Sequence, residues 1–174
     1  MQTQVTLNEF ADLIVHAGSK VTVMGQGEPG IGKSAMLKKI AAVMPHLRPV
    51  YLDAALLDLG DIQMPKVLED GVKFIPNSLF VSDTPILLML DEVGKAMRPV
   101  QNALLPLMLE HRVGNYTLPE GSIVFATTNL STDGVGDAVQ AHARNRMCVV
   151  HVKKPDAGFD DAGAVTKDGW AAWA

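Results

Sequence analysis

The sequence has little cysteine, few aromatic residues and no long apolar run. Its single cysteine, Cys148, excludes an internal disulfide and is typical of a reducing compartment. Aromatic residues make up 5% of the chain, which predicts an aliphatic core. No apolar run approaches the ~20 residues of a membrane span, and the start MQTQVTLNEF lacks the basic segment and apolar run of a signal peptide. These absences predict a soluble cytoplasmic protein without a membrane partner.

Positive charge is also scarce. The 174 residues carry 15 Lys and Arg against 19 Asp and Glu, a net charge of −4. This balance argues against a broad basic surface for non-specific binding of nucleic acid. The length is typical of one domain with a sizeable buried core. We therefore expect a single globular domain that is not built around a nucleic-acid partner.

A glycine-rich stretch, GEPGIGKS, stands out against this background. Its spacing, Gly27-x-x-x-x-Gly32-Lys33-Ser34, is typical of a loop that binds nucleotide phosphates. Glycines at 27, 30 and 32 let backbone N–H groups face the phosphates without Cβ clashes, and a helix predicted from Lys33 adds its positive end. Lys33 is expected to contact the β- and γ-phosphates and Ser34 to ligate Mg²⁺. The predicted nucleotide-binding residues are Gly27, Glu28, Pro29, Gly30, Ile31, Gly32, Lys33, Ser34 and Ala35.

Apolar segments alternate with helical patterns along the chain. A capping box, Thr6-x-x-Glu9, predicts the start of a first helix, and Asp70-Gly71 predicts the turn of a small hairpin. The alternation predicts an α/β fold with a parallel, doubly wound sheet and a ligand at the carboxyl ends of the strands. Strands are predicted over residues 20–26, 49–53, 86–90, 122–129 and 147–152, and helices over 33–44 and 99–111.

Polar residues follow two of these buried strands. Asp91 ends the apolar run ILLML, where a carboxylate has no packing value, and we expect it to hold Mg²⁺ through water. Glu92 beside it is the predicted base for an attacking water. Asn129 ends the strand SIVFATTN and is predicted to orient that water. The three side chains predict hydrolysis of the bound nucleotide.

A GTPase is the first alternative, because Asp91-x-x-Gly94 also fits the pattern in which a glycine amide senses the γ-phosphate. A GTPase also needs an Asn/Thr-Lys-x-Asp motif after a later strand to recognise guanine. The nearest match, Thr166-Lys167-Asp168, has the wrong spacing and follows no predicted strand. Guanine recognition is therefore unsupported.

The order of the motifs resembles one known family. GEPGIGKS, LLMLDE, FATTN and ARNRM follow one another as the Walker A, Walker B, sensor 1 and arginine-finger motifs do in AAA+ ATPases. The segment DEVGKAMRPVQNALLPLMLEHRVGNYTLPEGSIVFATTN is similar to the MoxR and dynein-related branch, with its Gln-containing helix and its hairpin ending in Leu-Pro-x-Gly. The resemblance spans residues 6–156 and implies the three-layer P-loop NTPase fold of the AAA+ large subdomain.

The resemblance also assigns roles to residues. It implies that Lys33 and Ser34 bind phosphate and Mg²⁺ and that Asp91 positions the metal. Glu92 would activate water, with Asn129 as sensor 1. Arg146, directly before the last strand, would be the arginine finger, and Arg144 competes for that role. Residues 1–156 would form the ATP-binding core and 157–174 the truncated start of a helical lid or a tail.

By resemblance, the expected function is ATP-Mg²⁺ binding and hydrolysis between the subunits of a homo-oligomeric ring, a hexamer in this family. Hydrolysis would remodel a protein partner, in this branch often one with a von Willebrand factor A domain. A nucleic-acid-directed ATPase, such as a helicase loader or phage replication factor, is an alternative that DNA-stimulated turnover would favour. A non-hydrolysing, nucleotide-dependent scaffold is a third reading, and the presence of Glu92 and Asn129 argues against it.

Overall fold

A parallel sheet lies between two helical layers in the computed structural model, which describes residues 4–129 and 145–155. The six strands run in the order β1-β10-β2-β9-β6-β3, and every neighbouring pair is parallel. This confirms the predicted parallel, doubly wound sheet. The strands are β1 (Gln4–Val5), β2 (Val23–Gly27), β3 (Arg48–Asp53), β6 (Ile86–Asp91), β9 (Ile123–Asn129) and β10 (Cys148–Val152).

The register of the strands brings their polar ends to one edge of the sheet. Gly27 at the end of β2 pairs with Asn129 at the end of β9. Asp53 at the end of β3 pairs with Asp91 at the end of β6. Because the strands are parallel, residues that are far apart in the sequence meet where the strands end.

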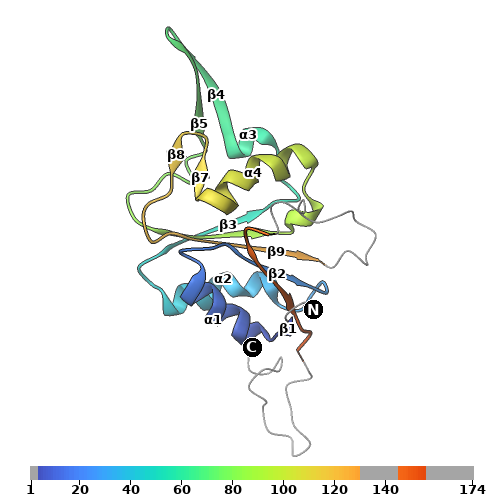
Figure 1. The fold of residues 1–174 in the computed structure, drawn as a ribbon. Coiled ribbons are helices and arrows are strands. Elements are labelled where there is room, and N and C mark those ends of the chain that lie inside the picture. Colours follow the sequence, from blue (N-terminus) through green and yellow to red (C-terminus); the bar gives the residue numbers. More distant parts are fainter. Residues whose placement is uncertain (1–3, 130–144, 156–174) are drawn as a thin grey trace, which may run out of the picture.

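Helices cover both faces of the sheet (Figure 1). On one side lie α1 (Leu7–Ala17) and α2 (Met36–Val43), and on the other α3 (Leu59–Ile62) and α4 (Arg98–Glu110). The predicted capping box at the start of α1 is confirmed: Thr6 Oγ1 accepts the Glu9 N–H at 3.2 Å, and Glu9 Oε2 accepts the Thr6 N–H at 2.7 Å. No helix of the described residues is both long enough and apolar enough to cross a membrane.

Strand β6, which lies between β9 and the edge strand β3, is buried over its whole length, as the run ILLML predicts for a strand covered on both faces. Its side chains alternate between two cores. Leu87 and Met89 pack in the core that contains α1 and α2, whereas Leu88 and Leu90 pack in the core that contains α4. The same alternation with period 2 places Asp91, at the end of the strand, on the face of Leu87 and Met89, which α1 and α2 cover.

A hairpin of β4 (Gln63–Leu68) and β5 (Gly71–Pro76) projects beyond the layer of α3 and α4 (Figure 1). Leu68 pairs with Gly71, so the two turn residues are Glu69 and Asp70, one position earlier than the predicted Asp70-Gly71 turn. The hairpin leaves apolar side chains in solvent, with Val67 at 80% and Val72 at 57% exposure. A second, shorter hairpin, β7 (Arg112–Val113) and β8 (Tyr116–Thr117), follows α4.

Candidate active site

The glycine loop connects β2 to a 3-10 turn, Lys33–Ala35, which continues into α2. Gly30 and Gly32 have φ angles of 76° and 90°, a region that side-chain-bearing residues rarely adopt. Gly27 is required for a different reason: a Cβ there would lie 2.6 Å from Ile31 Cδ1 and 2.8 Å from the Val152 carbonyl oxygen. The helix predicted from Lys33 is therefore present, but its first turn is a 3-10 turn.

The other loop residues have different surroundings. Ile31 is buried in the core shared with α1 and α2, so only its backbone is available to a ligand. Glu28 is exposed, and its carboxylate lies 3.7 Å from the Lys154 ammonium. Pro29 and Ala35 are exposed as well. The side chains that point into the site from this loop are thus those of Lys33 and Ser34.

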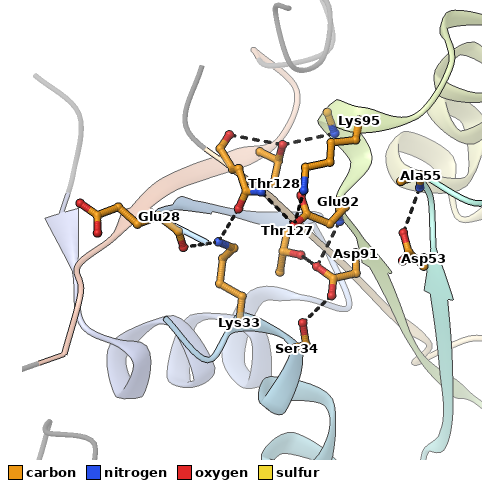
Figure 2. A network of polar contacts seen from close by, with 12 residues as sticks. Glu28, Lys33, Ser34, Asp53, Ala55, Asp91, Glu92, Lys95, Thr127 and Thr128 are labelled. Atoms are coloured by element: carbon orange, nitrogen blue, oxygen red, sulfur yellow. Dashed lines mark hydrogen bonds and ion pairs between the residues drawn. The ribbon is translucent and has the colours of Figure 1, made fainter. Parts of the chain in front are cut away.

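Lys33 is only 6% exposed, which is rare for a lysine. Its ammonium donates to the carbonyl oxygens of Gly27 at 2.9 Å and Glu28 at 2.8 Å, and to Asn129 Oδ1 at 3.0 Å. Figure 2 shows this side chain reaching across the end of the sheet from the loop. The buried charge is compensated by oxygen atoms of two elements, the glycine loop and the end of β9.

Asp91 accepts four hydrogen bonds. Ser34 Oγ donates to its Oδ2 at 2.6 Å and the Tyr51 hydroxyl to the same oxygen at 3.2 Å. Thr127 Oγ1 and the Glu92 N–H, the latter at 3.0 Å, donate to its Oδ1. Ser34 and Thr127 approach Asp91 from two sides in Figure 2. The carboxylate is 4% exposed and is therefore held in one orientation by donors from the loop, β3 and β9.

Tyr51 has a pKa raised to about 12. Burial is the largest cause, followed by the negative charge of Asp91 and the hydrogen bond to it, and then by the charges of Asp53 and Glu92. All of these disfavour the phenolate. The Tyr51 hydroxyl therefore keeps its proton at neutral pH and acts as a donor toward Asp91.

Glu92 has a left-handed backbone, with φ 54° and ψ 36°, which is uncommon for a residue other than glycine. Its Oε1 accepts a hydrogen bond from Asn129 Nδ2 at 2.9 Å and lies 3.2 Å from the Lys95 ammonium. Its Oε2 is buried and has no hydrogen-bond partner among the described residues. One carboxylate oxygen is thus fixed while the other remains an available acceptor.

These residues enclose a cavity of about 250 Å³, lined by Gly30, Gly32, Lys33, Ser34, Asp91, Glu92 and Asn129. The structure thus brings together the predicted residues of the glycine loop, of β6 and of β9. The hydroxyl of Ser34 and the carboxylate of Asp91 are the hard oxygen ligands that Mg²⁺ prefers, and they lie within 2.6 Å of each other. The buried ammonium beside them suits a phosphate. The residues present fit a nucleotide with Mg²⁺.

Arg146 is not part of this cavity. It is exposed and precedes β10, whose first residue, Cys148, pairs with Val23 at the amino end of β2. Five residues of strand, about 16 Å at 3.3 Å each, separate this edge of the sheet from the edge that carries the site. Arg146 therefore cannot act on the nucleotide of its own chain. Arg144 lies outside the described residues.

The sequence patterns assigned no role in the site to four residues that contribute to it. Thr127 lies two positions before Asn129 on β9, so strand alternation could have placed it on the same face. Tyr51 and Lys95 give no sequence signal that separates them from surface residues. Gln101 on α4 is buried, and its amide donates to the carbonyl oxygens of Ala96 at 3.0 Å and Gly94 at 3.4 Å. It thereby holds the loop that follows Glu92.

Solved structures share this fold at low sequence identity. A "putative ATPase" from Cytophaga hutchinsonii is 19% identical, with a TM-score of 0.58 over 87% of this chain and 48% of that chain. NtrX from Brucella abortus in complex with ADP is 19% identical, with a TM-score of 0.57 over 90% of this chain and 37% of that chain. A full-length MCM homolog from Methanopyrus kandleri is 18% identical, with a TM-score of 0.51 over 83% and 32%.

The chain spans a third to a half of the length of these structures. Neither the sequence profiles of known protein families nor the curated proteins match it. The likeness is therefore one of fold, and it agrees with the parallel sheet order and with the glycine loop at the end of β2. The chain has the α/β fold of the P-loop NTPases, a three-layer sandwich around a parallel sheet.

Proposed function

We propose that this chain binds ATP with Mg²⁺ and hydrolyses it, as the core of a MoxR-like AAA+ ATPase. The observation that carries the proposal is the single cavity in which Lys33 and Ser34 of the glycine loop face Asp91, Glu92 and Asn129. Phosphate-binding groups alone would support binding. An acidic pair and an amide on the opposite wall of the same cavity support hydrolysis.

Each side chain has a distinct task in this reaction. Lys33 would exchange its loop carbonyl partners for phosphate oxygens, which are stronger acceptors for an ammonium. Ser34 and Asp91 would hold the Mg²⁺, which neutralises phosphate charge when bound. Glu92 would take the proton of the attacking water at Oε2, because Oε1 is already bonded by Asn129 and Lys95. Asn129 connects Lys33 with Glu92 and would place the water relative to the γ-phosphate.

The position of Arg146 supports action between subunits. An exposed arginine on the edge of the sheet opposite to its own site is available to a neighbouring subunit. An arginine supplied to the γ-phosphate increases the rate by roughly 10³–10⁵-fold. We propose a homo-oligomeric ring, a hexamer by resemblance, in which Arg146 completes the neighbour's site.

The β4–β5 hairpin supports a protein partner. Its exposed apolar side chains, among them Met64, Val67, Val72 and Phe74, are the kind of surface that binds protein. We propose that the ring remodels a protein, with a von Willebrand factor A domain protein as a candidate partner. Stimulation of turnover by DNA but not by protein would favour a nucleic-acid-directed ATPase in its place.

The test separates binding from chemistry. Glu92→Gln keeps the shape of the side chain and removes the base, so we expect this variant to bind a fluorescent ATP analogue at least as well as wild type and to release no phosphate. Lys33→Ala should lose binding of the analogue. Glu120→Gln, at an exposed position, is the matched control and should behave as wild type. Normal phosphate release by Glu92→Gln would show that Glu92 is not the base.

A further inference from the structure

We infer that the Tyr51 hydroxyl is a displaceable hydrogen-bond donor to Asp91. It would compete with a water bound to Mg²⁺ for an acceptor site on this carboxylate, and so set the concentration of Mg²⁺ that the site requires. The inference rests on the proposed function, because it concerns the same nucleotide site. Tyr51 comes from β3, which is separated from the glycine loop by α2 in the sequence. It has no part in the motifs on which that function depends.

The acceptor sites of the Asp91 carboxylate are all in use. An ionised carboxylate offers about four lone-pair sites for hydrogen bonds. In Asp91, Oδ2 accepts Ser34 Oγ and the Tyr51 hydroxyl, and Oδ1 accepts Thr127 Oγ1 and the Glu92 N–H. All of its sites are thus occupied by donors of the chain. A water bound to Mg²⁺ can donate to Asp91 only if one of these donors leaves.

Of the four donors on Asp91, Tyr51 is the one that can leave. Thr127 is fully buried in β9, and the Glu92 N–H belongs to the backbone next to Asp91 itself. The Ser34 hydroxyl makes the short bond of 2.6 Å, and it can keep its proton on Asp91 while its lone pairs face a cation. Tyr51 makes the long bond of 3.2 Å from a side chain that is 47% exposed. Water can replace Asp91 as the partner of its hydroxyl at little cost.

Loss of the Tyr51 hydroxyl should change the affinity for Mg²⁺ in a defined direction. Removal of the Tyr51 hydroxyl opens an acceptor site on Asp91 and leaves the negative charge of the carboxylate less compensated. Both changes favour the hydrated cation, so Mg²⁺ should bind more tightly. If Tyr51 served only to position Asp91, its loss would make Mg²⁺ bind more weakly. The two roles therefore predict opposite shifts.

The experiment is a Mg²⁺ titration of Tyr51→Phe, with the whole chain and a fluorescent, non-hydrolysable ATP analogue in a metal-free buffer. We expect the half-saturating Mg²⁺ concentration to fall about three- to tenfold relative to wild type. Tyr116→Phe is the matched control, because within the described part of the chain the Tyr116 hydroxyl bonds only the backbone N–H and carbonyl of Ser82, each at 3.0 Å. It should leave the titration unchanged. An unchanged or higher Mg²⁺ requirement in Tyr51→Phe would overturn the inference.

A second measurement does not depend on a variant. The chain has two tyrosines, so selective isotope labelling gives one NMR signal for Tyr51 and one for Tyr116. Addition of Mg²⁺ with the analogue should move the Tyr51 signal toward that of a water-bonded phenol and leave Tyr116 in place. If the chain binds the analogue but the Tyr51 signal does not move, the displacement of Tyr51 is refuted and the proposed function is not. Absence of any Mg²⁺-dependent binding by wild type would refute the proposed function together with this inference.

Discussion

Replacement of Thr127 by valine tests how strongly the fold depends on the donors around Asp91. Thr127 has no exposed surface, and its hydroxyl donates to Asp91 Oδ1. Valine has nearly the same volume, so the packing of β9 against its neighbours is kept. The change removes one donor from a carboxylate that is itself 4% exposed.

The magnitude follows from this geometry. A hydrogen bond to a charged group contributes about 1.5–3 kcal/mol to the free energy of unfolding. The second methyl group of valine occupies the place of the hydroxyl, so water cannot take over the lost bond to Oδ1 at this buried position. For a chain of this size, 1 kcal/mol corresponds to a shift in Tm of about 2–4 °C. We therefore expect Thr127→Val to lower Tm by about 3–12 °C. The denaturant m-value should stay unchanged, because the folded state remains equally compact.

The assays are thermal unfolding for Tm and urea unfolding for the m-value, both followed by circular dichroism, with Thr127→Ser as the matched control. Serine keeps the hydroxyl and loses one buried methyl group, which costs about 1 kcal/mol. If the bond to Asp91 matters more than the methyl, Thr127→Val must be less stable than Thr127→Ser. The opposite order would show that Asp91 does not need this donor.

Two further predictions concern other parts of the chain. Arg146→Ala alone and Glu92→Gln alone should have no ATPase activity. A mixture of the two variants should regain part of the activity, at interfaces that combine an intact Arg146 of one subunit with an intact Glu92 of its neighbour. Wild-type turnover by Arg146→Ala would show that Arg146 is not the finger, and Arg144 would then be tested. Burial lowers the pKa of His111 in the folded chain below its usual value of 6.5. As the pH falls below 6.5, the unfolded chain therefore binds a proton at His111 more readily than the folded chain, and the free energy of unfolding decreases. His111→Asn, which tolerates the left-handed backbone at φ 51°, should show a smaller difference in unfolding free energy between pH values above and below 6.5, and an unchanged difference would exclude His111 as the cause.

Local patterns were sufficient for most elements of the fold and for the glycine loop. Three of these features depend only on residues that are neighbours in the sequence and could therefore be predicted from it: the capping box at Thr6, the buried run of β6 and the spacing from Gly27 to Ser34. Parallel strands place their carboxyl ends together, which is why Asp91 and Asn129 could be predicted to meet the loop. Details of local geometry, such as the 3-10 turn at Lys33, were not readable.

The tertiary structure alone decided which side chains complete the site. Tyr51 alternates along β3 like any half-exposed strand residue, and only the pairing of β3 with β6 brings its hydroxyl to Asp91. The left-handed backbone of Glu92 and the bonds from Asn129 and Lys95 likewise depend on where separate elements end in space. Sequence specified the chemical groups through local spacing. Long-range strand pairing specified their hydrogen-bond partners, because those contacts join residues up to 96 positions apart.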